Sequence, residues 1–238
     1  DGAPITLPNK EMAVGVFYLT TIDETLRKDN GETVFSNISE AMLAHSFNKI
    51  ELREPIKVKV GKDSLETTIG RLMFNEHLPE ALGFVNEPVK ASGIKKIITK
   101  AMNSCSPEEV EELIDRIKTL GFYGSTVSGI SVSLFDTTLV SEKQDLIDAA
   151  EKKITEIDSE YQKGLITNDE RKRLSNEVWL KTTEIIADVT WDLLTPGNVI
   201  RTIIDSEGAR AGKEQLKQLS AMRGLILDPL GKIVEVPI

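Results

Sequence analysis

At residues 141–194 the chain reads SEKQDLIDAAEKKITEIDSEYQKGLITNDERKRLSNEVWLKTTEIIADVTWDLL, and this stretch decides the predicted fold. Ser141–Gln144 and Thr167–Glu170 both have the capping-box form that starts a helix. Gly164 supplies the backbone freedom that ends the first helix, and Pro196 stops the second. The stretch therefore predicts two antiparallel helices joined by a short turn, each about 30 Å long at about 1.5 Å per residue.

Apolar side chains recur along both helices at spacings of three and four, which is typical of a seam that faces a partner helix. On the first helix they are Ile147, Ala150, Ile154, Ile157 and Tyr161, and on the return they are Leu174, Val178, Ile185 and Val189, with Trp179 and Ile186 beside them. The pattern predicts a projecting two-helix coiled-coil hairpin.

The residues before the hairpin mix helical and β-prone patterns. Met12–Leu19 is apolar throughout and predicts a buried element, whereas Pro55–Val60 alternates apolar and charged residues as a half-buried strand does. Glu66–Phe74 is a second β-prone run. Residues 91–105 and 106–120 predict two helices, because Ser106-Pro107 between them is a helix start signal.

The predicted fold class is therefore α+β, a mixed small domain with short strands and helices plus the hairpin. We expect three parts: 1–140, the hairpin at 141–195, and a return segment at 196–238 whose helix packs back on the body. Residues 121–133 are rich in glycine and serine but poor in charge, which predicts close backbone contacts there.

Composition excludes several classes of protein. The chain has 238 residues, a net charge of −9 and no apolar run near the ~20 residues of a membrane span, so we expect no membrane contact. The net charge argues against a broad nucleic-acid-binding surface, because such binding depends on Lys and Arg. Cys105 is the only cysteine, which excludes an internal disulfide and predicts a cytoplasmic protein. The start at Asp1, without methionine or signal peptide, predicts a piece of a longer polypeptide.

No motif in the chain indicates a reaction by itself. His45 and His77 lack neighbouring ligands at metal-binding spacing, so structural or surface roles explain them and no metal site is predicted. Four carboxylates within residues 108–112 fit the first turns of a helix and need no acid–base role. Neither common nucleotide-binding loop is present. We therefore predict no catalytic residue.

Five blocks resemble one family in the same order along the chain. Residues 207–225, EGARAGKEQLKQLSAMRGL, resemble the SGARG…QIRQL.GMRGL segment of the largest subunit, β′, of bacterial RNA polymerase. The other four are PNKE with Val14-Gly15 (8–15), similar to PS[QR]D…LG; TTIGR (67–71), similar to TTVGR; VNEPVK (85–90), similar to VNQPLK; and SGISV (128–132), similar to SGASV. The resemblance covers essentially the whole chain.

The resemblance implies a position in a DNA-directed RNA polymerase, a nucleotidyltransferase. The chain would be the pore and funnel portion, 1–140 the pore domain and 141–195 the funnel hairpin, lining the secondary channel through which NTPs enter. The loop that holds the catalytic Mg²⁺ would lie outside it, as would the Zn²⁺ of the parent enzyme, so the isolated chain is expected to be inactive and to carry no cofactor. Its partners would be the β, α and ω subunits and the rest of β′, with DNA and RNA contacted only through the parent complex.

The resemblance also implies two residues near the NTP phosphates. Arg210 matches an arginine of the family close to these phosphates, and Lys10 matches a position that is Arg or Gln. Glu207 stands where serine is usual and Ala211 where glycine is usual, so the sequence departs from the family's pattern on both sides of Arg210. The alternative for Arg210 is an ion pair with a neighbouring carboxylate such as Glu207.

At the tip of the hairpin, the resemblance implies a docking surface for channel-inserting regulators of the Gre type. We assign Gln162, Asp169 and Glu170 to it. Residues 141–194 hold eight Lys or Arg against thirteen Asp or Glu, and this acidic surplus is explained either by docking or by a solvated helix face. A different class of function also fits, namely a stand-alone adaptor that offers its acidic coiled coil to protein partners.

Overall fold

The computed structural model describes residues 4–28, 33–60, 63–137, 140–209, 211–231 and 233–234. The chain forms two compact units, each made of two separate segments. The first unit contains Asp1–Ser131 and Thr202–Arg210, and the second contains Val132–Arg201 and Ala211–Ile238. The predicted three-part division at 140 and 195 stays a prediction.

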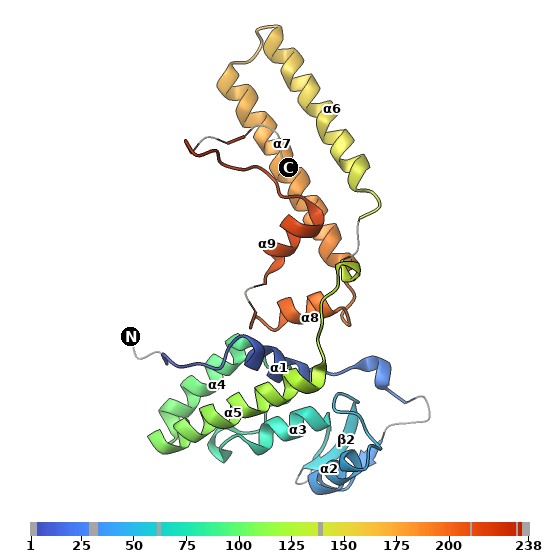
Figure 1. The fold of residues 1–238 in the computed structure, drawn as a ribbon, viewed down its shortest axis with the longest axis vertical. Coiled ribbons are helices and arrows are strands. Elements are labelled where there is room, and N and C mark those ends of the chain that lie inside the picture. The colour runs from blue at the N-terminus through green and yellow to red at the C-terminus, as the bar shows by residue number, and fades with distance from the viewer. Residues whose placement is uncertain are drawn as a thin grey trace. The chain divides into compact units, whose positions relative to one another are not determined.

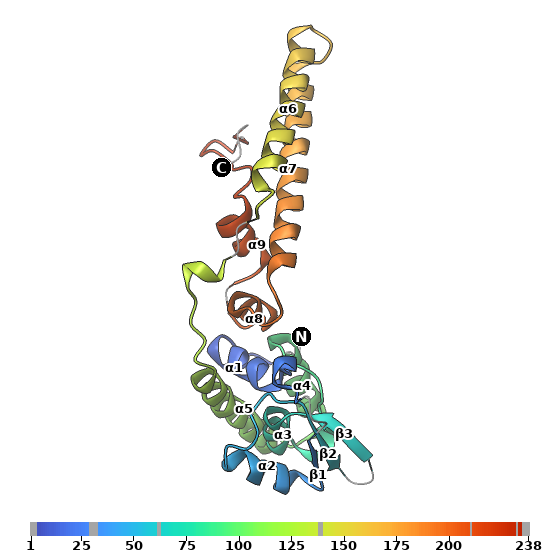
Figure 2. The same ribbon diagram turned by 90° about the vertical axis from the view of Figure 1, so that its right-hand side faces the viewer.

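The first unit combines a small sheet with helices, so the α+β fold class is confirmed. Its elements are α1 (Glu11–Thr20), the 3-10 turn η1 (Glu24–Leu26), β1 (Val34–Phe35), α2 (Ile38–Ser46), β2 (Ile56–Val60), β3 (Asp63–Thr67), α3 (Ile69–Glu76), the 3-10 turn η2 (Glu80–Leu82), α4 (Ala91–Ser104) and α5 (Pro107–Ser128). Figure 2 shows the strands beside α2 and α3, and Figure 1 shows α4 and α5 running alongside each other.

The sheet has the order β1-β2-β3, with β1 parallel and β3 antiparallel to β2. Residue Val58 pairs with Phe35 on one side and with Leu65 on the other. The predicted strand at 55–60 is confirmed as β2. Ile56 and Val58 are fully buried, as the alternating pattern requires of the face that meets the core.

The prediction of a second strand at Glu66–Phe74 was wrong beyond Thr67, because helix α3 follows. Thr68 caps α3, its Oγ1 accepting a hydrogen bond from the Arg71 amide at 3.2 Å. The cap satisfies one of the amides that a helix start leaves unpaired. The cap and the buried face of α3, which includes Ile69 and Phe74, therefore stabilise a helix here despite the local β propensity.

Arg71 joins two of the sequence blocks inside the core. Only 5% of the residue is exposed, and its Nε donates to the Thr20 carbonyl at 2.7 Å. Its Nη1 donates to the carbonyl of Asn86 at 2.8 Å. Burial lowers the pKa of the guanidinium, because a charged group loses its hydration there. The TTIGR and VNEPVK blocks thus meet at the end of α1.

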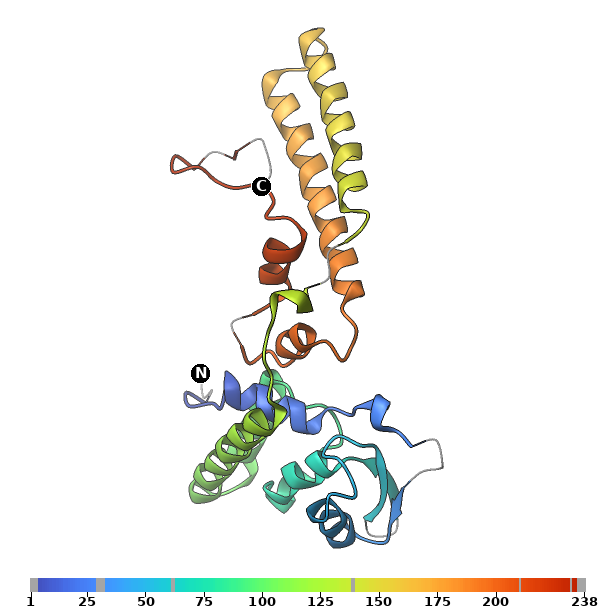
Figure 3. The same ribbon diagram turned by 45° about the vertical axis from the view of Figure 1, so that its right-hand side comes forward.

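Close backbone packing of α1 on α5 accounts for Gly121 and Gly124. A Cβ on Gly15 would overlap the Gly121 carbonyl oxygen, and one on Gly121 would lie 2.8 Å from the Met12 Cα. Figure 3 shows α1 lying across α5. The second predicted helix consequently runs on past Leu120 to Ser128, because its small residues face α1.

The second unit contains the hairpin. Its elements are the 3-10 turn η3 (Leu134–Asp136), α6 (Lys143–Gln162), α7 (Asn168–Leu193), α9 (Lys213–Leu216) and a π turn (Lys217–Ala221), while α8 (Val199–Asp205) passes from this unit into the first. Figures 1 to 3 all show α6 and α7 side by side with a turn at one end. Past this unit's π turn, Leu227 pairs with Ile233 in an isolated antiparallel bridge.

The buried face of α7 differs from the predicted seam. Its most buried residues are Ser175, Trp179, Thr183, Ile186 and Thr190, whereas Ile185 is 41% exposed. The reason is a second partner, because Ala221 and Met222 pack on α7 together with Ala150 of α6. Thr183 and Thr190 can be buried there, since each hydroxyl donates to the carbonyl four residues earlier at 2.7 Å.

Among the described helices, none combines the length and the apolar character that crossing a bilayer requires.

Replacing Gly15 by Ala should destabilise the first unit by about 1–3 kcal/mol or more, because the added methyl group meets backbone atoms that cannot turn away. Urea unfolding of the purified chain, followed by circular dichroism, measures the change. Gly93→Ala is the matched control: its Cβ would meet only a Val89 methyl at 3.4 Å, so it should stabilise α4 by about 0.5–1 kcal/mol. Equal effects of both variants would contradict the close-packing account.

Candidate functional site

A hollow in the first unit gathers residues from three parts of the chain. Its volume is about 500 Å³, which is in the range of small-ligand pockets. It is lined by Lys10, Glu11, Val14, Ser125, Ile130, Ile203 and Ala209. The structure therefore brings Lys10 close to the loop that precedes Arg210, although the two are far apart in the sequence.

Lys10 stands at the start of α1 in an unusual backbone conformation. Its φ of 54° is in the region that glycine favours, and its carbonyl accepts the amide of Val14 at 3.0 Å. A non-glycine residue at such a φ costs of order 1–3 kcal/mol and persists only where its surroundings impose it. Gly208 is part of these surroundings, because a Cβ there would lie 2.7 Å from the Lys10 carbonyl oxygen. The Lys10 side chain itself is exposed.

The loop at 206–209 is held by the first turn of α4. The Ala91 amide donates to the Ser206 carbonyl at 3.0 Å, and the Ser92 amide donates to Oε2 of Glu207 at 3.3 Å. Lys90 Nζ lies 3.8 Å from Oε1 of the same carboxylate. The hydrogen bond from Ser92 and the nearby lysines lower the pKa of Glu207. The Glu207 carboxylate is thus engaged by α4.

Arg210 lies outside the described residues. Its predicted role and its alternative, an ion pair with Glu207, both stay predictions. What is described is the residue before it, Ala209, which lines the hollow together with Lys10.

The three predicted docking residues lie around the turn between α6 and α7. Gln162 ends α6, and Gly164, with φ 73°, follows it. Asp169 and Gln162 are exposed, and Glu170 is half-buried. Across the turn, Arg171 Nη1 pairs with Asp158 at 3.2 Å. This pair connects the two helices near their junction.

Both predicted capping boxes need correction. α6 begins at Lys143 after a turn in which the Lys143 amide donates to Val140, so Ser141 lies within that turn and does not cap the helix. Thr167 does cap α7, accepting the Glu170 amide at 3.2 Å. The Glu170 carboxylate instead binds Arg173, at 2.7 and 3.0 Å. An oppositely charged neighbour three residues on competes successfully with the backbone amide.

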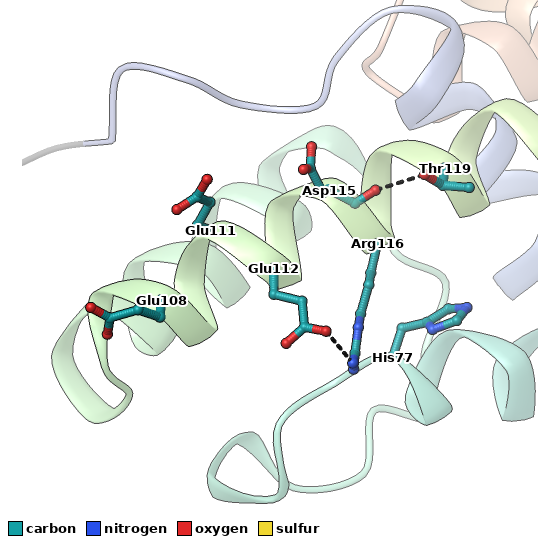
Figure 4. A pocket seen from close by; sticks show the side chains of 7 residues that line it. All are labelled: His77, Glu108, Glu111, Glu112, Asp115, Arg116 and Thr119. Atoms are coloured by element: carbon teal, nitrogen blue, oxygen red, sulfur yellow. Dashed lines mark hydrogen bonds and ion pairs between the residues drawn. The ribbon is translucent and has the colours of Figure 1, made fainter.

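Glu108, Glu111 and Glu112 line a second hollow of about 440 Å³ (Figure 4). Glu112 pairs with Arg116 at 2.6 Å, and the Thr119 hydroxyl donates to the Asp115 carbonyl at 2.9 Å. Glu109 forms a full capping box with Ser106. Helix capping accounts for Glu109 and an exposed ion pair accounts for Glu112.

The described residues do not fit a metal ion. No group of three or more His, Cys, Asp or Glu side chains among them is arranged to hold one.

The comparisons with known proteins agree on one family. The family RNA polymerase Rpb1, domain 3, matches residues 1–137. The chain belongs to this family. Over its full length it is 38% identical to the DNA-directed RNA polymerase subunit beta′ of Thermosipho melanesiensis, 38% to that of Clostridium acetobutylicum and 34% to that of Desulforudis audaxviator. The chain spans only 15, 22 and 20% of these three relatives.

Sequence reasoning missed the contact between Glu207 and α4. A signal for it was present, because the predicted helix at 91–105 begins after Lys90, which is not a residue that caps a helix. In the structure Lys90 makes no side-chain cap hydrogen bond. Such a helix start requires acceptors from elsewhere in the chain. The sequence could not say which segment supplies them.

Glu207 should contribute stability that depends on pH. Because its folded pKa is lowered, the contribution is present above about 4.3, the ordinary value for glutamate, and is lost as the pH falls through the lower folded pKa. The charged groups concerned are Lys90 and Lys96. The Glu207→Gln variant should therefore lose less stability than the parent chain as the pH falls from about 5 to about 3, a window of about two pH units around the ordinary pKa of glutamate. Parallel urea titrations at each pH measure the difference, and identical pH profiles would contradict it.

Proposed function

We propose that this chain is the pore and funnel portion of the largest subunit of a DNA-directed RNA polymerase. In this role it lines the secondary channel through which NTPs enter and carries a docking surface for regulators. It supplies no catalytic group and no metal ligand. The proposal includes the remaining β′ polypeptide and the β, α and ω subunits as partners, in the cytoplasm.

The observation that supports this proposal best is the hollow shared by Lys10 and Ala209. It puts an exposed cation beside the loop that leads directly to Arg210. A guanidinium forms paired, charge-assisted hydrogen bonds with phosphate oxygens, and an ammonium adds a point charge. In our proposal these two cations bind the triphosphate of the incoming NTP and orient it, while the parent enzyme holds the metal.

The family assignment favours this proposal over the stand-alone adaptor. The relatives match the whole length of this chain within a much longer polymerase subunit. No feature of the described residues favours the adaptor specifically.

In the parent enzyme, Arg210→Ala should lower kcat/KM for NTP addition by about 5- to 150-fold, which corresponds to about 1–3 kcal/mol. Assembly should be unaffected, because the loss is one of substrate binding. Arg210→Lys keeps the charge but not the planar guanidinium, so its kcat/KM should lie between those of the parent enzyme and the Ala variant. Steady-state kinetics on the assembled variants provides the measurement. An unchanged kcat/KM in the Ala variant would count against the proposal.

The double reversal Asp169→Lys with Glu170→Lys should slow the association of a channel-inserting factor roughly tenfold at low salt. The acidic surplus attracts a basic partner at a distance, so the difference should shrink as salt screens the charges. Stopped-flow association at two ionic strengths measures this effect.

The structure supplies the control for that experiment. Thr167→Ala removes the cap of α7, at a cost of about 1 kcal/mol, without changing any charge. Glu170→Gln removes one charge and the pair with Arg173 but leaves the cap. If Thr167→Ala slows association as much as the double reversal, or if the double reversal has no effect at low salt, the tip is a solvated turn.

A further inference from the structure

The start of α4 depends on acceptors from a distant part of the chain. A helix leaves its first four amides without partners inside the helix, and Lys90 at the cap position makes no side-chain hydrogen bond to them. Two of these amides, at Ala91 and Ser92, donate to Ser206 and Glu207. The loop at 206–209 therefore acts as the cap of α4.

The charge of Glu207 suits this place. The amino end of a helix carries partial positive charge, and a carboxylate is stabilised near it. Lys90 is 3.8 Å away, and Lys96 also lowers the pKa of Glu207. The side chain remains 45% exposed, so the contact is modest in energy but fixed in direction.

The loop has little freedom to take another position in the first unit. Glu207 has a φ of 57°, which a residue with a side chain adopts only when held there. On its other side, Gly208 is pressed against α1, where a Cβ would lie 2.7 Å from the Ala13 Cβ. The loop is thus fixed between the starts of α1 and α4, immediately before Arg210.

We propose that Glu207 is a positioning residue for substrate binding: its carboxylate anchors the 206–209 loop to the first turn of α4 and so fixes the backbone up to Ala209, the residue before Arg210 in the sequence. This inference rests on the proposed function, because anchoring the 206–209 loop affects substrate binding only if Arg210 binds the NTP. Glu207 does not touch the substrate. Its effect should therefore appear in KM and only weakly in kcat.

The experiment uses the parent polymerase assembled with four variants. Glu207→Ala and Glu207→Gly remove the carboxylate, and the glycine also removes the cost of the positive φ. Glu207→Gln keeps an acceptor of the same length. Glu112→Gln is the matched control, because it makes the same chemical change at an exposed ion pair on α5.

Two measurements are made on each variant: hydrogen exchange of the peptide that contains the Ala91 and Ser92 amides, and KM with kcat for NTP addition. For Glu207→Ala and Glu207→Gly we expect faster exchange and a KM raised roughly three- to tenfold, the range that loss of a helix cap corresponds to. The kcat should stay within about twofold of the parent value. Glu207→Gln should be intermediate, and Glu112→Gln should match the parent enzyme.

Three results would overturn the proposal. Unchanged exchange in Glu207→Ala would show that the carboxylate does not anchor the loop. If Glu207→Ala changes exchange and KM but Glu207→Gly does not, the change comes from backbone strain and not from loss of the carboxylate. Faster exchange without a change in KM would leave an anchor that positions nothing, and Arg210→Ala then separates the two ideas: a raised KM in that variant keeps the proposed function, and an unchanged one removes it.

Discussion

The first unit depends on how closely α1 approaches its neighbours. Gly15 and Gly121 let the backbones of α1 and α5 touch, and a Cβ on Gly70 would overlap the Leu19 carbonyl where α3 meets α1. Interiors are packed as densely as organic crystals, so contacts of this kind cannot be loosened locally. The position of α1 in turn fixes α3, through Arg71, and the hollow, through Lys10. The hollow is therefore a consequence of helix packing.

The same packing explains how a strained site can persist. Lys10 and Glu207 both have positive φ, and Gly208 packs closely against the start of α1. Strain of this size needs surroundings that over-determine the backbone. The core of the first unit provides them, with Ala13 and Val16 fully buried just behind the site. A rigid helix start and a short loop thus present their polar groups in a fixed arrangement.

Most features set by neighbouring residues could be predicted from the sequence, although Ser141 does not cap α6, and features set by distant residues could not be predicted. The start of α5 at Ser106-Pro107 and the end of α6 near Gly164 follow from local capping chemistry. The buried face of α7 was shifted from the prediction because Ala221 and Met222, far along the chain, pack on it. In the candidate site, the roles of Lys10 and Arg210 were predicted from the family resemblance. The shared hollow and the cap on α4 depend on contacts across most of the chain.

The exchange of segments between the two units bears on the order in which the protein is made. Thr202–Arg210 belongs to the first unit, whereas the residues before and after it belong to the second. A ribosome that adds about 5–20 residues per second exposes α1 to α5 on the order of ten seconds before this segment appears. During that interval the start of α4 has no cap and the hollow lacks one wall, while α6 and α7 emerge and pair through local contacts. Translation therefore allows α6 and α7 to pair before the first unit is complete, whereas the buried face of α7 is covered only when Ala221 and Met222 appear.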